Sequence, residues 1–129
     1  RVLDPVAQSE LVETLNGYDV GIHVLPPTSE NNSLALPNKF FDFIQARLAV
    51  IVGPSLEMAR IVSEYELGVV TADFSEASIR AALDTLTIAD IDRAKRAADA
   101  AAPALSSESQ VGVWKRAVDQ IIERQGVRA

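Results

Sequence analysis

Cysteine is absent from this chain of 129 residues, and histidine occurs once, as His23. The absence of cysteine excludes a disulfide framework, a thiolate metal site and a cysteine nucleophile. A single histidine limits histidine-based metal sites and catalytic triads almost as severely. Asp90 and Asp92 do not have the spacing of a metal-binding loop, and we interpret them as a solvated helix start. The residue types therefore predict no metal site and no metal cofactor.

Basic residues are too few for a nucleic-acid-binding surface. Lysine and arginine number 12 against 18 aspartates and glutamates, which gives a net charge of −6. Because nucleic acids are bound by basic surfaces that displace counterions, we expect no nucleic-acid partner. Long apolar runs are also missing, since none approaches the roughly 18–20 residues of a membrane span. Without such a span or a signal-peptide pattern, we expect a soluble, cytoplasmic protein.

Aromatic side chains are scarce, with 4 Phe, 2 Tyr and 1 Trp, whereas hydrophobic residues make up 48% of the chain. That hydrophobic fraction is enough for a core and excludes intrinsic disorder. We expect the core to be mainly aliphatic. The helical spacing of Phe40, Phe41 and Ile44 predicts that they lie in it, and we expect the same of Trp114. The length fits a single domain.

Segments with strand-like apolar patterns alternate with segments of helical periodicity. Strands are predicted at residues 1–6, 19–25, 48–52 and 67–71. Helices are predicted after the N-caps Ser9, Ser55 and Ser75, from Pro37 as first helical residue, and over residues 88–102 and 107–124. Gly17 is predicted to end the first helix in the left-handed conformation. This order predicts an α/β fold, a Rossmann-like parallel sheet of about four strands flanked by helices.

The polar segments that follow the predicted strands are the expected ligand site. In open parallel sheets, ligands bind outside the carboxyl ends of the strands, here residues 24–33, 53–55 and 71–75. The first of these segments is the longest and most polar, and it leads into a helix N-terminus. Free N–H groups and the positive dipole end of that helix favour an anionic ligand.

A series of short motifs resembles the C-terminal, donor-binding domain of GT-B glycosyltransferases of the group-1 (family 4) type. The motifs that carry the resemblance are D-V-G at 19–21, P-N-K-F-F-D at 37–42, A-V-I at 49–51, R-I-V at 60–62 and G-V-V at 68–70. Residues 1–15 also look like a segment of that family. No single motif is diagnostic, but their order is fairly specific, and the resemblance covers nearly the whole chain.

The resemblance implies a nucleotide-sugar donor as substrate and no further cofactor. The donor contacts that it implies are Ser33, Leu36, Asn38, Lys39 and Asp42, with His23 as a weaker candidate. Asp42 stands where the family's acidic residue hydrogen-bonds the ribose hydroxyls, and a carboxylate is a suitable acceptor for a diol. Lys39 is placed to contact a phosphate. The chain is accordingly identified as the distal part of a glycosyltransferase donor domain that acts on an unknown acceptor.

Two positions depart from the family pattern. Leu34 stands eight residues before Asp42, where the family's E-x(7)-E motif has its first acid, and Asp42 itself replaces the longer glutamate. These departures leave open a second interpretation, a non-catalytic α/β binding or interaction module derived from the same fold. A nucleotide-sugar epimerase is a weaker third interpretation, because the acids and histidine that it needs have no match here.

The resemblance begins at the third strand of the family's domain, so we expect residues 1–129 to be a fragment. The first β-α units of the domain would be missing, together with the N-terminal acceptor domain of the parent chain. That domain is the expected partner, and the fragment alone is expected to be inactive. The sheet edge left open by the missing strands favours a homodimer.

Overall fold

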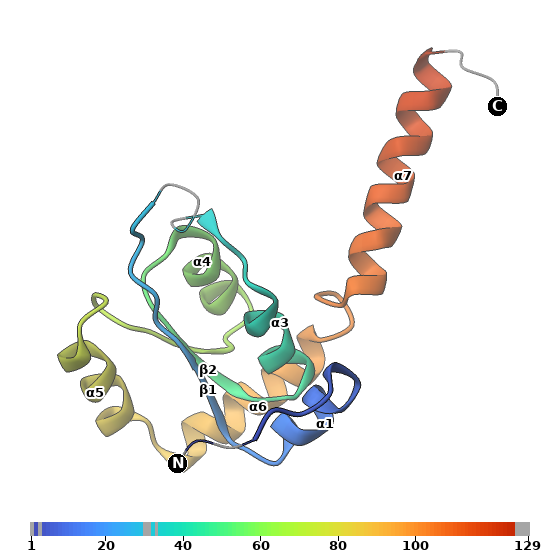
Figure 1. Ribbon diagram of the computed structural model, residues 1–129. Coiled ribbons are helices and arrows are strands. Elements are labelled where there is room, and N and C mark those ends of the chain that lie inside the picture. Colours follow the sequence, from blue (N-terminus) through green and yellow to red (C-terminus); the bar gives the residue numbers. More distant parts are fainter. Residues whose placement is uncertain (1, 3, 30–31, 33, 126–129) are drawn as a thin grey trace.

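The computed structural model describes residues 2, 4–29, 32 and 34–125. Its secondary structure alternates strands with helices and ends in three consecutive helices (Figure 1). In chain order the elements are η1 (Gln8–Glu10), α1 (Leu11–Asn16), β1 (Val20–His23), α3 (Asn38–Gln45), β2 (Ala49–Val52), α4 (Leu56–Glu64), β3 (Gly68–Val70), α5 (Glu76–Thr85), α6 (Ile88–Ala101) and α7 (Ser107–Gln125).

The three strands form one parallel sheet in the order β1-β2-β3. Val20 pairs with Ala49 at the start of β1, and Val50 pairs with Gly68 at the start of β3. All four residues of the central strand β2 are buried, as its continuous apolar run predicts for a strand covered on both faces. The α/β class with a parallel sheet flanked by helices is therefore confirmed.

The sheet has three strands in the described part of the chain, and the strand predicted at residues 1–6 is wrong as far as that segment is described. Val2 and residues 4–7 form no strand. Asp4 and Val6 line an apolar pocket of about 360 Å³ together with Val20 and Ile22 of β1. No ladder of hydrogen bonds joins residues 4–7 to β1, which is an edge strand among the described residues.

The core lies between the sheet and the helices α3 and α4. Both crossovers advance in the same direction along the sheet, and right-handed connections therefore place α3 and α4 on the same face. Phe43 packs directly against Gly21, where a Cβ atom would collide with the phenyl ring. The other buried residues of this cluster include Phe40, Ile44, Val50, Val52, Met58, Ile61 and Val62.

Helix α6 is fastened to the body through small buried residues and ion pairs. Ala94, Ala98 and Ala101 are buried, which allows a close approach to the neighbouring elements. Asp99 accepts a 2.6 Å bond from Arg47, just after α3, and Lys95 lies 3.0 Å from Asp19, just before β1. These ion pairs join α6 to the segments that follow α3 and precede β1.

Several predicted helix ends differ in detail. Ser75 caps α5 as predicted, because its hydroxyl accepts the Ser78 N–H. Ser9 lies within the 3₁₀ turn η1 and caps nothing, whereas Ser55 takes the N-cap position of α4 without a side-chain bond. Pro37 is the N-cap of α3 and not its first helical residue. The helix therefore begins at Asn38, one residue later than predicted. Gly17 has a φ of −73°, so it ends α1 in the right-handed conformation.

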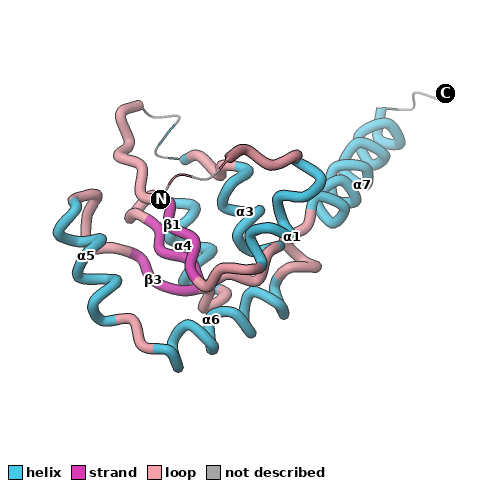
Figure 2. Tube along the Cα trace, turned by 60° about the horizontal axis from the view of Figure 1, so that its bottom comes forward, coloured by secondary structure: helices cyan, strands magenta, loops and turns pink. Residues whose placement is uncertain are grey.

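Helix α7 extends away from the body (Figures 1 and 2). Ser106 precedes it and accepts the Ser109 N–H at 3.2 Å, as an N-cap does. The placement of Trp114 in the core is wrong, because this side chain is 72% exposed. The apolar stripe that the sequence predicts for this helix is exposed along its length, at Val111, Trp114, Val118, Ile121 and Ile122.

Candidate functional site

A cleft of about 280 Å³ lies between α3 and the start of α7, and we call it the α3–α7 cleft. Asn38, Asp42 and Gln45 follow one another at helical spacing and so lie on one face of α3. The opposite face carries Phe40, Phe43 and Ile44 into the core. The complete lining is Gln8, Asn38, Phe41, Asp42, Gln45, Leu105, Ser106 and Ser107.

The lining combines hydrogen-bonding groups with an apolar patch. The Asp42 carboxylate accepts hydrogen bonds, while the amides of Gln8 and Asn38 both donate and accept them. Phe41 supplies the aromatic surface, and its ring meets that of Phe40 edge-to-face with centroids 5.5 Å apart. Such a surface suits a ligand that carries hydroxyl groups beside a flat or apolar part.

Gln45 closes one end of the cleft by joining α3 to the turn before α7. Its side-chain amide donates to the carbonyl of Ala102 at 2.9 Å and to that of Leu105 at 3.5 Å. Leu105 packs against the core, and its N–H donates to the Ala101 carbonyl. Residues 60 positions apart in the chain therefore form the two sides of one cleft.

The beginning of α7 already carries a negative charge. The pKa of Glu108 is lowered because its carboxylate accepts its own backbone N–H, and also because the Ser107 and Ser106 hydroxyls donate to it. This carboxylate satisfies the positive end of the helix dipole. Glu108 follows the lining residue Ser107, and Asp42 itself lines the cleft. Their negative charges favour a neutral, hydroxyl-bearing part of a ligand there over a phosphate.

His23 and Lys39 form a separate group near the carboxyl end of β1. His23 is half-buried there, and its pKa is lowered by burial first and by the positive charge of Lys39 second. Lys39 is exposed on the first turn of α3. Neither residue lines the α3–α7 cleft. The structure thus divides the predicted site residues into a cleft pair, Asn38 and Asp42, and a basic pair, His23 and Lys39.

The other two predicted donor contacts are Leu36 and Ser33. Leu36 is exposed in the loop before α3 and does not line the cleft. Ser33 lies outside the described residues. Leu34, which stands in the place of the family's first acid, is 56% exposed.

Protein atoms fill part of the crevice at the carboxyl ends of β2 and β3. The Phe74 ring lies so close to Gly53 that a Cβ atom there would collide with it. Ser55 is buried beside this point, and its hydroxyl has no hydrogen-bond partner among the described residues. The cleft that contains Asn38 and Asp42 lies along the outer face of α3, apart from this crevice.

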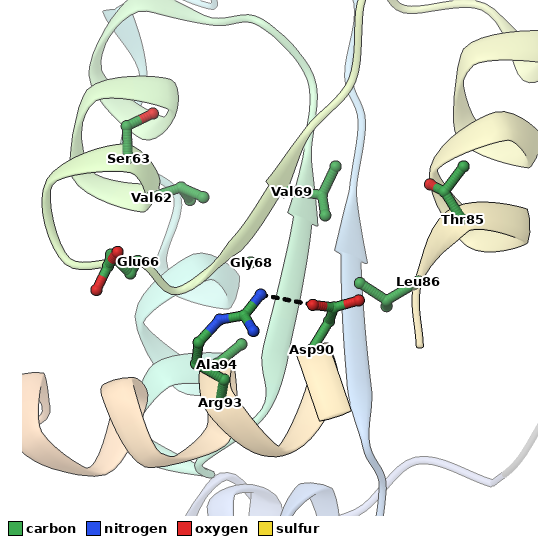
Figure 3. A pocket seen from close by; sticks show the side chains of 10 residues that line it. All are labelled: Val62, Ser63, Glu66, Gly68, Val69, Thr85, Leu86, Asp90, Arg93 and Ala94. Carbon is green, nitrogen blue, oxygen red and sulfur yellow. Dashed lines mark hydrogen bonds and ion pairs between the residues drawn. The ribbon is translucent and has the colours of Figure 1, made fainter. Parts of the chain in front are cut away.

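A second cavity, of about 340 Å³, lies at the amino end of β3, and Figure 3 shows its lining. Its charged residues are Glu66, Asp90 and Arg93, and the last two form an ion pair at 2.5 Å. The Asp90 carboxylate also accepts from the Thr87 N–H and hydroxyl, so it is occupied in capping α6. None of the predicted site residues lines this cavity, and it faces away from the strand ends where ligands usually bind.

Sequence reasoning missed most of the cleft. Gln45 lies at helical spacing from Asn38 and Asp42, so the sequence could have placed it on the same face of the helix. Phe41 was assigned to the core, whereas it is only half-buried and lines the cleft. Gln8 and the residues 105–107 come from distant segments, and no local pattern links them to α3.

Two features are absent from the described part of the chain, a metal-binding cluster and a membrane-spanning helix. No group of three or more His, Cys, Asp or Glu residues there is arranged to hold a metal ion. Among the same residues, no helix is long and apolar enough to cross a membrane.

The chain was compared with known proteins at three levels. No protein-family model matches it, and no match was found among curated proteins or solved structures.

Proposed function

We propose that this chain is the donor-binding part of a glycosyltransferase, and that the α3–α7 cleft holds the nucleoside end of a nucleotide diphosphate sugar. The observation that carries the proposal is the position of Asp42 and Asn38, which open into one cleft beside Phe41. The order of motifs that resembles the group-1 glycosyltransferases supports the same assignment. The enzyme would transfer the sugar to an acceptor of unknown structure.

Asp42 binds the ribose in this proposal. A carboxylate accepts hydrogen bonds from two neighbouring hydroxyls, and such charge-assisted bonds are stronger than those between neutral groups. Asn38 adds a donor and an acceptor on the same helical face. Because Asp42 and Glu108 make this region acidic, the phosphates point away from it.

The diphosphate binds near Lys39 and His23 in this proposal. Lys39 lies on the first turn of α3, where the free N–H groups of an eight-residue helix also favour an anion. The helix thus separates the two ends of the donor, with Asp42 toward the ribose and Lys39 toward the phosphates. In the reaction, these groups orient the donor and stabilise the charge of the departing diphosphate.

The acceptor site and the rest of the donor site belong to other parts of the enzyme in this proposal. We expect the N-terminal domain of the parent chain to bind the acceptor, and we expect no turnover from residues 1–129 alone. The protein groups described above supply positioning and electrostatic stabilisation.

One observation favours a second function, that of a non-catalytic binding module. An exposed leucine, Leu34, stands where the resemblance places the first acid of the donor site. A Leu34→Glu substitution in the full-length parent distinguishes the two functions. If the parent binds the donor and needs no acid at this position, it turns over substrate equally well with Leu34 and with Leu34→Glu. If it is a module that has lost its donor site, neither the unchanged parent nor the variant shows turnover.

Saturation-transfer NMR with UDP, GDP and their sugars tests the proposed function. We expect transfer to the ribose protons of at least one nucleotide. Asp42→Asn should reduce the affinity about tenfold or more, because a hydrogen-bonding carboxylate is lost. Asp84→Asn is the matched control on the exposed surface of α5, and its affinity should stay unchanged. Absence of transfer from every nucleotide tested would contradict the proposal.

A further inference from the structure

Helix α7 packs little against the body in the part of the chain that the structure describes. It extends from the body over Ser107–Gln125 (Figures 1 and 2). Its side chains from Val113 to Glu123 are exposed. Its connection to α6 is the turn at residues 102–106, which we call the hinge. The contacts of this hinge therefore determine how α7 is directed.

Gln45 is the side chain that ties the hinge to α3. Upstream of the hinge, α6 is already fixed by the ion pair between Asp99 and Arg47. Within the hinge, the Gln45 amide reaches the carbonyls of Ala102 and Leu105. The same side chain lines the α3–α7 cleft, together with Ser106 and Ser107.

We infer that Gln45 couples the α3–α7 cleft to the direction of α7, so that a ligand in the cleft restrains this helix. A ligand that contacts α3 on one side and residues 105–107 on the other binds better when the two sides hold their relative positions. Such differential binding shifts the population toward the restrained arrangement. The apolar stripe of α7 is then presented in one direction. The ligand part of this inference rests on the proposed function.

Trp114 reports this restraint directly, because it is the chain's single tryptophan and lies on α7. The time-resolved fluorescence anisotropy of Trp114 separates rotation of the helix from tumbling of the whole protein. Gln45→Ala should increase the amplitude of the fast component in the absence of any ligand. Gln120→Ala, the same change on the exposed surface of α7, should leave it unchanged.

Circular dichroism of each variant checks that the helices are retained. An anisotropy decay of Gln45→Ala that equals those of Gln120→Ala and the unchanged protein would overturn the inference. This comparison needs no ligand, so it decides the role of Gln45 whether or not a nucleotide binds.

The ligand part is tested with UDP and GDP, whose binding is measured separately by equilibrium dialysis. Saturating nucleotide should reduce the fast component of Trp114 in the unchanged protein. Asp42→Asn at the same nucleotide concentration should show a smaller reduction. Binding without any change in the Trp114 decay would overturn the ligand part and leave the proposed function standing. Absence of binding would contradict the proposed function, and the ligand part with it.

Discussion

Two residues without glycine's freedom adopt left-handed backbone conformations, Arg47 with φ 63° and Glu66 with φ 55°. Each follows the end of a helix, α3 or α4. The N–H of the next residue, Leu48 or Leu67, reaches back to the carbonyl of Phe43 or Val62, as in a Schellman motif. The backbone strain at these positions is offset by the hydrogen bonds that close the helices.

Glycine at one of these positions should stabilise the fold. Glu66→Gly relieves the left-handed strain of a residue with a Cβ atom, and we expect the free energy of unfolding to rise by about 0.5–1 kcal/mol. Urea unfolding followed by circular dichroism measures the change. Ser63→Gly, on the helical surface of α4, is the control and should lower stability by several tenths of a kcal/mol. A loss of stability in Glu66→Gly would contradict this account of the helix end.

Asp90 provides a second test at the residue scale. Its pKa is lowered to about 2, chiefly by the Thr87 hydroxyl, then by the Thr87 backbone N–H and the Arg93 side chain. Because the folded-state pKa lies below the ordinary value of 3.8, the contribution to stability is present above that value. It is lost as the pH falls from there toward about 2.

Thr87→Ala should therefore raise the pKa of Asp90 toward its ordinary value. Carboxyl ¹³C chemical shifts, followed through an acid titration, measure this pKa. Thr87→Ser keeps the hydroxyl and should keep the pKa low. If Thr87→Ala leaves the titration of Asp90 unchanged, the hydroxyl is not the main cause of the shift.

At the scale of the element, α3 presents two different faces. Phe40, Phe43 and Ile44 are buried in the core cluster, whereas Asn38 and Asp42 open into the cleft. A helix of eight residues thus serves both the core and the candidate site. Substitutions on the two faces should separate stability from binding.

Phe43→Ala and Phe41→Ala test this separation. Phe43 is buried against Gly21, so its removal should cost about 3–5 kcal/mol of unfolding free energy. Phe41 is half-buried in the cleft lining, so its removal should cost less stability but weaken UDP or GDP binding. Denaturant unfolding and calorimetric titration measure the two effects. Equal losses of stability with unchanged binding would contradict the assignment of the two faces.

The strands of the sheet could be predicted because buried strands have characteristic local patterns of apolar residues. The apolar run at 48–52 predicts a strand covered on both faces, and β2 is such a strand. The segment at residues 1–6 carries a similar pattern, but a strand also needs a neighbour within hydrogen-bonding distance. The prediction that Trp114 lies in the core is wrong for a related reason. The apolar stripe of an amphipathic helix does not reveal which surface, if any, covers it.

The candidate site was predictable only where its residues share one helix. The spacing of Asn38 and Asp42 places both on one face of α3, and the structure brings them into the same cleft. Lys39, their neighbour in sequence, does not line the cleft, because consecutive helix positions diverge by about 100°. Ser106 and Ser107 belong to the cleft through tertiary packing, which local sequence does not encode.

The whole molecule consists of a small α/β body and a projecting helix (Figure 1). Among the residues that the structure describes, β1 and β3 are the edge strands of the sheet, and Ile22 on β1 is 42% exposed. Pairing of two copies through such an edge stays a prediction, as does docking against the N-terminal domain of a parent chain. The α3–α7 cleft lies where the body meets the projecting helix, so a ligand bound there would contact both parts.

The most direct test of the central claim is an amide ¹H–¹⁵N chemical-shift map of the chain with UDP or GDP. The account predicts shifts over α3, from Asn38 to Gln45, and at Ser106 and Ser107, with a smaller response near His23. Amides around the second cavity, including Glu66 and Arg93, should stay unchanged. Shifts confined to that second cavity, or no shifts with either nucleotide, would contradict the assignment of the cleft as a nucleotide site.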